Sequence, residues 1–515
     1  MLSILFLAGI SLFIWLCLVH YKIHTYFRYK NVPFIPPCSL FGNIKNLMLY
    51  RCCFGEQFYQ LYNHDTKKDE SIVGIHVLHN QAILLRSSKL IKQILISDFS
   101  AFANRFETTD IDGDTMGSLN LFFAKYDVWK DIHKIFSPLF SHGRVKLMFP
   151  NLLKIGRNLE SMLCEENFNE IDNSVILEMK ELCARFTTDT IASLAFGIES
   201  KCLEGGDISG LRGMCKEVNE PHLKRVLHLF VMFFFPRFAK ILRTRLYSRQ
   251  YEHFMRNLVE YVMEHRKNGG EVRNDLIDIF LQLQCNELNH KESVVNKKDF
   301  FAAQAAFLLL AGFDTSSSTI SFTLYELAKK PICQIRLRKE ITEMLHDSNN
   351  SPTYDSINQM PYLRMVVDEV LRLYPPTAFL DRCCTAEKGY SLAPYSNFTI
   401  PKGMPIYISV LGLHRDEKFW PKPNEFMPER FSDENRHKIT SMSYLPFGNG
   451  PRGCIGSILG LMQVKIGLIY ILKNYYITPC KKTAPEMCFD PKTFVLTANQ
   501  GTYLRFVKDP LIENH

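Results

Sequence analysis

The sequence predicts a mostly helical fold with a smaller β portion. Helical spacing of apolar side chains marks residues 298–330, residues 360–373 and a last segment that runs on from Gly456. Residues 72–86 instead alternate in the manner of β-strands around a polar triplet, which is typical of a hairpin. Of the 515 residues, 46% are hydrophobic and 22% charged, which allows a large core and excludes a disordered chain or a multi-span membrane protein.

The chain opens on an apolar run from Leu2 to Val19, close to the shortest length that spans a bilayer. No Lys or Arg precedes this run and no small-residue cleavage site follows it, so we expect a single retained membrane anchor over residues 1–21 instead of a cleaved signal peptide. Basic residues follow the run and predict a cytosolic location for the rest of the chain. Residues 22–37, basic and rich in proline, are expected to form a linker, and residues 38–515 a single globular domain.

Charge and cysteine content narrow the class of protein further. The formal net charge of +8 suits an anionic membrane surface or an acidic partner protein, and no basic and aromatic tract of the nucleic-acid-binding kind is present in the sequence. The 15 cysteines are odd in number and lack zinc-type spacing. They indicate a reducing compartment in which most thiols are inert and buried.

The long helical segments have clear stop signals. Asp299 lies near the start of the first helix and Pro331 ends it, while Tyr374-Pro375-Pro376 ends the second. Short strands and turns are expected from 376 to about 408. The apolar and aromatic segment 227–238 has two open interpretations, a buried helix end or a surface patch that enters the bilayer.

A glycine-rich loop, Phe447-Gly448-Asn449-Gly450-Pro451-Arg452-Gly453-Cys454-Ile455-Gly456, precedes the last helix. Its glycines let the main chain approach a bulky planar ligand, and the following helix N-terminus favours a thiolate at Cys454. The loop resembles the haem-ligand signature of the cytochrome P450 family, F-x-x-G-x-R-x-C-x-G, at every fixed position. The resemblance implies a cytochrome P450 fold in which Cys454 is the axial ligand of haem b (iron protoporphyrin IX). It also implies a haem-binding loop that includes Phe447, Gly448, Arg452 and Gly456.

Within the first long helix, Ala311-Gly312-Phe313-Asp314-Thr315 resembles the family's A-G-x-[DE]-T segment. The resemblance implies that Asp314 and Thr315 help to deliver protons to iron-bound dioxygen. Without it, a buried helix with a polar seam would be the simpler interpretation. Phe307, Ala311 and Thr315 are four residues apart and share one helix face, so we expect them to face the haem pocket. Phe379 is a further candidate for the substrate pocket.

Glu369 and Arg372 are three residues apart on the second helix, which in isolation would indicate an exposed ion pair. The spacing is similar to the family's E-x-x-R. With Arg430 of Pro428-Glu429-Arg430-Phe431, the resemblance implies a structural triad that braces the haem-binding core.

Trp129-Lys130-Asp131-Ile132-His133 is similar to the family's W-x-x-x-R segment, whose Trp and Arg hold a haem propionate. This sequence has His133 in place of the arginine, which leaves that propionate contact open. The other candidates for the propionates are Arg452, Arg382 and Arg105.

Several segments, among them Ser137-Pro138-Leu139-Phe140, look most like insect microsomal members of the family. The resemblance implies a membrane-bound monooxygenase of the endoplasmic reticulum that inserts one oxygen atom into an apolar xenobiotic, lipid or hormone-like molecule. Since no GxGxxG unit is present in the sequence, electrons are expected from NADPH–cytochrome P450 reductase, with cytochrome b5 as a further candidate donor. Lys125, Lys130 and Lys134 are candidates for the docking face.

A haem protein without oxygenase activity and a peroxide-rearranging enzyme are the alternatives. A haem sensor or carrier would need Cys454 but not Asp314 and Thr315, and enzymes that rearrange a bound peroxide often lack the same pair. Both are disfavoured.

Overall fold

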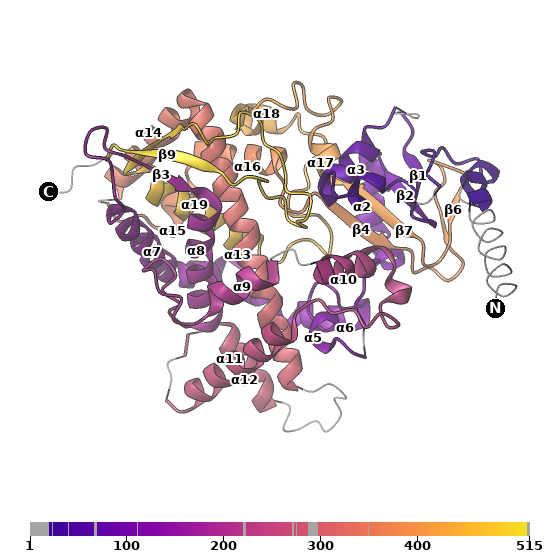
Figure 1. Ribbon diagram of the computed structural model, residues 1–515, viewed down its shortest axis with the longest axis horizontal. Helices are drawn as coiled ribbons and strands as arrows, with labels where there is room; N and C mark the ends of the chain where they lie inside the picture. The colour runs from indigo at the N-terminus through magenta and orange to yellow at the C-terminus, as the bar shows by residue number, and fades with distance from the viewer. Residues whose placement is uncertain are drawn as a thin grey trace, which may run out of the picture.

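The computed structural model describes residues 20–22, 24–39, 41–65, 69–110, 112–219, 223–269, 272–273, 275–286, 297–348 and 350–511. The expected membrane anchor therefore lies almost wholly outside the described residues. Helices dominate, and the strands form small sheets at two sides of the molecule (Figure 1), as the sequence predicts.

The helices follow one another in the order α2 (Lys45–Met48), α3 (Phe54–Tyr62), α4 (Ser88–Lys92), α5 (Thr115–Ser118), α6 (Tyr126–Phe136), α7 (His142–Cys164), α8 (Met179–Ile191), α9 (Leu211–Asn219), α10 (Leu223–Phe234), α11 (Arg249–Lys267), α12 (Leu276–Asn286), α13 (Lys297–Lys329), α14 (Pro331–Asp347), α15 (Tyr354–Asn358), α16 (Pro361–Leu373), α17 (Val410–His414), α18 (Asp433–Arg436) and α19 (Ser457–Leu472). The strands are β1 (Ile72–Val77), β2 (Asn80–Leu85), β3 (Ser174–Glu178), β4 (Phe379–Cys383), β5 (Tyr390–Ser391), β6 (Thr399–Ile400), β7 (Pro405–Ser409), β8 (Tyr475–Pro479) and β9 (Tyr503–Lys508).

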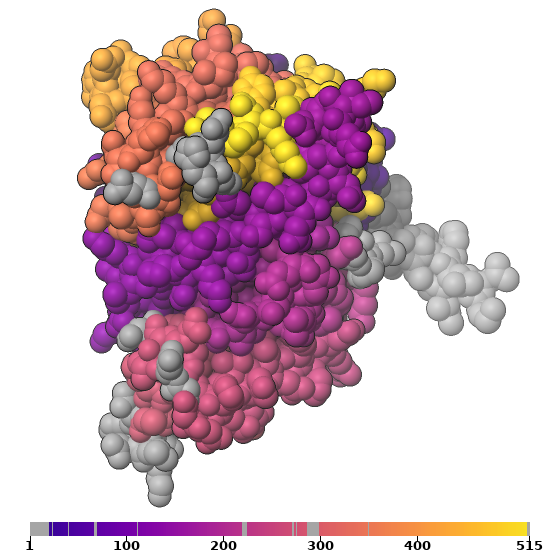
Figure 2. All heavy atoms as spheres, turned by 90° about the vertical axis from the view of Figure 1, so that its left-hand side faces the viewer, coloured from indigo at the N-terminus to yellow at the C-terminus, as the bar shows by residue number. Residues whose placement is uncertain are grey.

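The largest sheet has the strand order β1-β2-β7-β4. The hairpin expected over residues 72–86 is confirmed, with Ile72 opposite Leu85 and Val77 opposite Asn80. Strand β7 pairs with β2 in parallel and with β4 in antiparallel orientation, which joins the start of the domain to its last third. In a second sheet, β3-β9-β8, the C-terminal strand β9 pairs with β3. The yellow C-terminal part of the chain and a purple part accordingly meet on the face shown in Figure 2.

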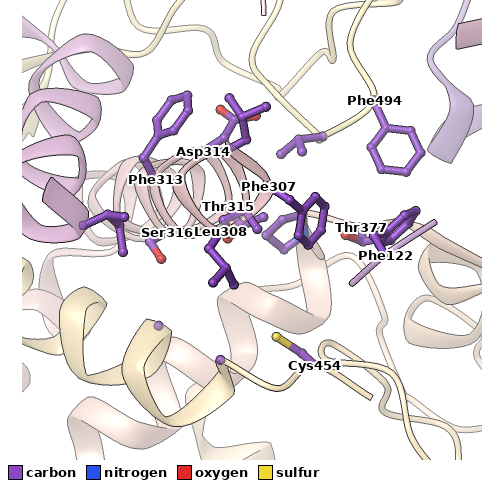
Figure 3. A pocket seen from close by; sticks show the side chains of 18 of the residues that line it. Phe122, Phe307, Leu308, Phe313, Asp314, Thr315, Ser316, Thr377, Cys454 and Phe494 are labelled. Carbon is purple, nitrogen blue, oxygen red and sulfur yellow. Dashed lines mark hydrogen bonds between the residues drawn. The ribbon is translucent and has the colours of Figure 1, made fainter. Parts of the chain in front are cut away.

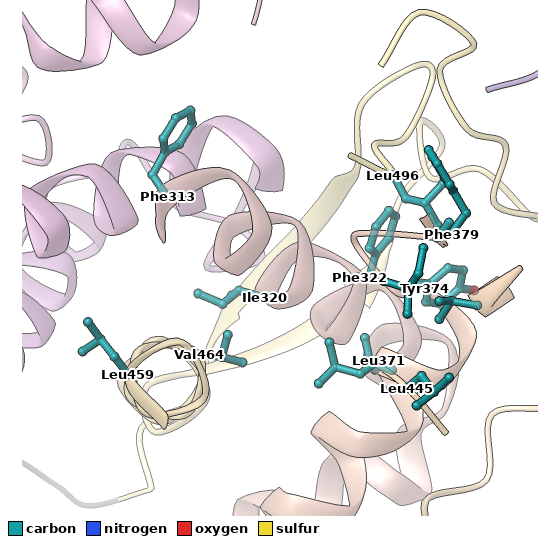
Figure 4. Packing of buried hydrophobic residues seen from close by; sticks show 14 of the residues in the cluster. Phe313, Ile320, Phe322, Leu371, Tyr374, Phe379, Leu445, Leu459, Val464 and Leu496 are labelled. Carbon is teal, nitrogen blue, oxygen red and sulfur yellow. The ribbon is translucent and has the colours of Figure 1, made fainter. Parts of the chain in front are cut away.

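Helix α13 is the central helix of the core, and it begins and ends almost where the sequence predicts. Pro331 lacks an amide proton and occupies the first position of α14, so it separates the two helices. By length and composition α13 could cross a membrane, yet 56% of its most apolar window is buried inside the protein. It packs on α8, α11, α16 and α19, where Ile320 meets Val464 in the packed interior of Figure 4.

The boundary expected at residue 38 is too late. Phe27, Val32 and Ile35 are buried, and Phe27 packs against His76 with ring centroids 5.1 Å apart. The amide of Gly74 donates to the carbonyl of Pro33 at 2.7 Å, because proline lacks a donor but keeps its acceptor. The proline-rich segment is therefore an added edge of the β1 sheet and not a spacer that stands away from the domain.

The apolar segment 227–238 has a buried and an exposed face, and the entry of the exposed face into the bilayer stays a prediction. Phe233 and Phe234 are buried, whereas the side chains of Leu227 and Phe238 are 56% and 45% exposed. Helix α10 is thus amphipathic, with one side on the core and the other on the surface.

Candidate active site

A cavity of about 630 Å³ lies between α13 and the glycine-rich loop that precedes α19. Cys454 projects toward it from below, and Leu308 and Thr315 face it from α13 (Figure 3). Residues from α6, α8, α10 and the segment before Phe494 complete the wall. The structure therefore brings together the cysteine loop and the Asp314-Thr315 segment, which are far apart in the sequence.

The loop around Cys454 has a backbone path that its glycines permit. Gly448 and Gly450 have φ values of 67° and 74°, and a Cβ atom on Gly450 would lie 2.0 Å from the carbonyl oxygen of Leu95. The amide of Cys454 donates to the carbonyl of Phe447 at 2.8 Å, which closes the loop. This hydrogen bond holds Cys454 where its side chain lines the cavity.

The Cys454 side chain is accessible from the cavity although protein surrounds the loop. Burial raises the pKa of this thiol, and the backbone amide of Gly456 acts in the opposite direction. A thiol in such a position remains protonated until a metal ion binds it, since a coordinating thiol is deprotonated by the metal. The loop is thus chemically fitted to an iron ligand and poorly suited to a free nucleophile.

Thr315 bends its hydroxyl back to the helix. Its Oγ1 donates to the carbonyl of Ala311 at 2.8 Å, and both residues line the cavity with Phe307. Gly312 lies between them, where a Cβ atom would be 2.5 Å from Cδ1 of Ile191 on α8. The glycine therefore allows α8 and α13 to approach closely while the Thr315 hydroxyl stays beside the cavity.

Asp314 is held by a residue that the sequence pattern did not single out. Lys180 of α8 donates from Nζ to Oδ1 of Asp314 at 2.7 Å and to its carbonyl oxygen at 3.0 Å. The same ammonium group reaches the hydroxyls of Ser317 and Ser318 at 2.9 and 2.7 Å. The three protons of Lys180 are thus shared among four acceptors on one turn of α13, which fixes the direction of the Asp314 carboxylate.

Three arginines that were expected to bind propionates gather near the loop. Arg452 donates from Nε to the carbonyl of Ala103 at 3.1 Å, while its buried Nη1 has no hydrogen-bond partner among the described residues. Arg105 lines the cavity and pairs with Asp381 at 3.2 Å. Arg382 is buried on β4 but is not among the residues that line the cavity.

The positive charges of these guanidinium groups repel one another. Burial lowers the pKa of Arg452 to about 9 and that of Arg382 to about 10, and the charge of Arg105 contributes to both shifts. Burial and the neighbouring Asp381 raise the pKa of Glu107 well above its usual range, which favours its neutral form. A cluster that keeps excess positive charge out of water fits the two carboxylates of haem. The cavity and its charges therefore fit this cofactor.

Trp129 and His133 lie on α6 at the edge of this cluster. The guanidinium of Arg452 lies 4.2 Å from the centre of a Trp129 ring, and the rings of Trp129 and His133 are 4.8 Å apart. His133 lines the cavity, and its Nδ1 lies 3.1 Å from the hydroxyl of Ser137. Burial and the charge of Arg452 lower the pKa of His133, so the ring is neutral near pH 7.

Glu369, Arg372 and Arg430 form one buried network below the loop. The carboxylate of Glu369 accepts from Nε of Arg372 at 2.7 Å and from Nε of Arg430 at 3.2 Å. Arg372 also donates to the carbonyls of His414 and Pro423, both at 2.7 Å. This i,i+3 pair is fully buried, unlike the exposed pair that the spacing alone would indicate.

Phe379 does not line the cavity, which corrects its sequence-based assignment to the substrate pocket. Side chains alternate along β4, and it is the neighbouring Leu380 that faces the cavity. Phe379 packs on the other side, 4.7 Å from the ring centre of Phe58 and 5.7 Å from that of Phe494. Which of the two neighbours faces the cavity depends on the register of β4, and no sequence motif indicates that register.

Several cavity residues carry no signal in the sequence. They come from loops and helix faces that only the tertiary fold brings together, and they include Phe122, Leu308, Thr377 and Phe494. Hydrophobic periodicity could have marked Leu308, which is one residue from Phe307 on α13, but not the others.

The comparisons with known proteins agree with this geometry. The family model described as cytochrome P450 matches residues 32–505. A probable cytochrome P450 6t1 of Drosophila melanogaster is 54% identical over 97% of this chain and 94% of its own length. A probable cytochrome P450 6g2 of the same fly is 40% identical over 95% of each chain, and cytochrome P450 6k1 of Blattella germanica is 34% identical over 94% and 93%. With a match of this extent and a cavity that fits haem above a cysteine loop, the chain belongs to the cytochrome P450 family and is a haem-dependent monooxygenase similar to insect members.

Proposed function

We propose that this chain inserts one oxygen atom from dioxygen into an apolar small molecule that binds between α13 and the Cys454 loop. The observation that carries the proposal is the continuity of the cavity. One space is lined by Cys454, by Thr315 and Asp314, and by a wall of aromatic and aliphatic side chains. An apolar wall with a few polar groups is the usual design of a site for an organic substrate.

Haem, when bound, supplies the activation of dioxygen and the oxidation chemistry. Cys454 would hold its iron, with the amides of the loop directed around the sulfur. Arg105, Arg452 and Trp129 would bind the propionate side. Arg382, although it does not line the cavity, would add positive charge there.

The chain's own part in the reaction is to admit protons while it excludes bulk water. The Thr315 hydroxyl is bonded to Ala311 in the helix and can turn toward a reacting oxygen. Asp314 lies next to it, and Lys180 connects this carboxylate to α8. We infer that protons pass along Asp314 and Thr315, one residue apart, whereas the aromatic wall keeps other water away.

We propose that residues 1–21 anchor the protein in the endoplasmic reticulum membrane, with the domain on the cytosolic side. A second contact with the membrane is supported by two segments that meet at the β1–β2 hairpin, the one that follows the anchor and the one that contains α10. Phe27 meets His76 of β1, while Asn80 at the start of β2 donates to the carbonyl of Phe234 at 3.2 Å. Beyond α10 the exposed apolar side chains are Phe238, Ile241 and Leu242.

This geometry changes the design of a membrane test. Polar substitutions at Phe233 or Phe234 would damage the core, and so would removal of the buried Phe27, so Ile241→Ser and Leu242→Ser are the appropriate changes in a protein that lacks residues 1–21. We expect the truncated protein to sediment partly with vesicles and these variants to sediment less. If the truncated protein is fully soluble, the proposed second contact with the membrane is wrong.

Electrons are proposed to come from NADPH–cytochrome P450 reductase, with cytochrome b5 as a further donor. Lys130 and Lys134 are exposed on α6 and remain candidates for the docking face. Lys125 does not, since its Nζ donates to the carbonyls of Arg105 and Glu107 at 3.2 and 3.1 Å and burial lowers its pKa.

The decisive experiment reconstitutes the full chain with a flavoprotein reductase in vesicles. NADPH should then drive oxygen uptake, and isotopically labelled dioxygen should leave one labelled atom in the product. A carrier or sensor of haem would consume no NADPH in the presence of substrate. An enzyme that rearranges peroxides would work without the reductase, and either result would reject the proposal.

A further inference from the structure

The cavity wall carries more positive charges than the haem propionates and the protein's own carboxylates neutralise. Seven of the lining residues are Lys or Arg and two are Asp. Lys180 pairs with Asp314, Arg212 pairs with Glu181 at 2.7 Å, and Arg105 pairs with Asp381. Charged groups inside an apolar cavity are unfavourable unless an opposite charge meets them. A lining cation that the protein leaves without a counter-ion would therefore favour an anionic ligand.

Arg225 on α10 is that cation. Its guanidinium carries five donor positions, of which Nη1 donates to the carbonyl of Leu246 at 3.1 Å. In the part of the chain that the structure describes, no carboxylate lies within ion-pair distance of Arg225. Burial lowers the pKa of Arg225, and the more distant Glu217, which accepts from the hydroxyl of Ser248 at 3.1 Å, counters only part of that effect.

A second polar group without a partner lies at the same end of the cavity. The Tyr247 side chain is 2% exposed, it lines the cavity, and its hydroxyl has no hydrogen-bond partner among the described residues. Burial raises the pKa of Tyr247 and Asp114 adds to that rise, while the charge of Arg225 opposes it, which shows that the two groups are neighbours. Asp114 does not provide the missing acceptor, because its carboxylate accepts from the amides of Leu246 and Gly117 at 2.8 and 3.1 Å.

The rest of α10 faces an apolar part of the same cavity. Val226, Leu229 and Phe233 line it together with Arg225 on one side of the helix. Phe233 lies eight residues beyond Arg225, about 12 Å along the helix axis. There it meets Phe123 and Phe494, with ring centroids 6.2 and 5.0 Å apart. The wall thus changes from cationic to aromatic over the length of a medium-sized organic molecule.

We propose that Arg225 and Tyr247 form a binding site for the anionic end of an amphipathic substrate, a carboxylate whose apolar body lies along α10 toward Phe233. This inference rests on the proposed monooxygenase function and names its substrate class. Arg225 supplies a charge-assisted hydrogen bond, and Tyr247 donates its hydroxyl proton to the second carboxylate oxygen. Since Tyr247 is buried and Arg225 is partly buried before anything binds, the substrate meets a preformed site.

The test compares a carboxylic acid with its own ester on the ferric holoenzyme. Dodecanoic acid and methyl dodecanoate share the same apolar chain, and binding is measured from the spin-state change of the haem spectrum. We expect the natural protein to bind the acid more tightly than the ester. Arg225→Met should weaken acid binding roughly 10-fold or more and leave the ester nearly unchanged, because a hydrogen bond to a charged group is lost only for the acid. Arg225→Lys should restore part of the preference.

Two further variants separate a specific site from a general electrostatic effect. Tyr247→Phe should weaken acid binding a few-fold. Arg212→Gln removes an arginine that lines the same cavity but already pairs with Glu181, so the acid-to-ester ratio should stay as in the natural protein. Equal weakening of acid and ester by Arg225→Met, or an equal loss in Arg212→Gln, would overturn the proposal.

The proposed function can be judged apart from this result. The carbon monoxide difference band of each variant reports an intact haem–thiolate site, and oxidation of a neutral apolar probe reports monooxygenase turnover. If both persist while the acid preference is absent, the substrate site is wrong and the monooxygenase function stands. If the natural protein oxidises neither acid nor neutral probe, the proposed function itself fails.

Discussion

The two sides of the cavity are built on different principles. Below it, the Cys454 loop is closed by backbone hydrogen bonds, and the buried carboxylate of Glu369 is shared by Arg372 and Arg430. Above it, α10 and the region around Tyr247 contribute single side chains. Among the described residues, Arg225 has no carboxylate partner and the Tyr247 hydroxyl has no hydrogen-bond partner. The Glu369 network is held by contacts within the protein, whereas Arg225 and Tyr247 keep donors that a bound molecule can use.

This difference separates cofactor binding from substrate chemistry. Changes on the lower side should remove the holoprotein, and changes on the upper side should leave haem in place and alter how protons and substrate reach it. Substitutions on the two sides should therefore differ in what they remove.

Replacement of the iron ligand should have the largest effect. Cys454→Ser is expected to abolish the red-shifted carbon monoxide band of the reduced protein, because serine offers no thiolate to the iron. Cys488→Ser is the matched control, since Cys488 is an exposed thiol elsewhere, and should keep the band. A Cys454 variant with the full band would move the ligand to another residue.

Glu369→Gln should prevent stable assembly of the lower side. It leaves the buried guanidinium of Arg372 without its counter-ion, and breaking a buried pair typically costs about 3–5 kcal/mol. The measurement is the haem-bound fraction and the temperature at which the haem absorbance is lost. Lys146→Gln removes an exposed ion pair with Asp355 and should change stability by about 1 kcal/mol or less. Similar effects of the two changes would contradict the structural role of the network.

Thr315→Ala belongs to the upper side and should leave haem binding intact. The hydroxyl beside the cavity is lost, so protons arrive less directly and more peroxide should be released for each NADPH oxidised. Thr315→Ser keeps a hydroxyl and should retain most of the coupling. Unchanged coupling in Thr315→Ala with several substrates would exclude Thr315 from the proton route.

Lys180→Met should have a smaller effect of the same kind. The Asp314 carboxylate would lose the ammonium group that fixes its direction, and we expect lower coupling with an unchanged carbon monoxide band. A larger solvent isotope effect on product formation would indicate a role in proton transfer, which mere loss of stability would not produce. Lys154→Met, at an exposed pair with Glu199, is the control. Loss of haem in Lys180→Met would assign Lys180 to the scaffold.

The smallest effect is expected at His133. Its lowered pKa leaves it neutral, so it offers a propionate less than an arginine would. His133→Arg should slow the transfer of haem to an apo-haem acceptor, and His133→Ala should speed it only modestly, within the roughly 1.5–3 kcal/mol of one charge-assisted hydrogen bond. Faster haem loss in His133→Arg would show that His133 is fitted to another partner.

The same division explains how much the sequence could predict. The hairpin, α13 and α16 were expected almost at their observed ends, and α19 almost at its observed start, because their signals are local: alternation, helical spacing and proline stops. The residues of the cysteine loop and the acid-threonine pair could also be named in advance, since each forms one short segment. Their roles remain predictions for the experiments above.

The upper side could not be predicted because it depends on contacts across the chain. Lys180 is 134 residues from Asp314, and nothing near it in the sequence indicates a partner. Phe379 and Leu380 are adjacent and equally apolar, and only the register of β4 decides which of them faces the cavity. The proline-rich segment was expected to be a spacer because no local signal marks a contact with the domain. Phe27 and Ile35 are buried against a sheet that forms only in the folded domain, so their burial could not be predicted.

Lys180 has a consequence for how such an enzyme can diversify. Helix α8 carries this lysine and also contributes Ala184 and Ile191 to the cavity wall. Evolution toward a larger substrate through that wall would have to shift or reshape α8, and the same movement would loosen the ammonium group from α13. Changes of specificity through α8 would therefore increase the peroxide released for each NADPH oxidised, whereas changes in α10 would not. We expect natural divergence among close relatives to concentrate in α10 and to spare the inner face of α8.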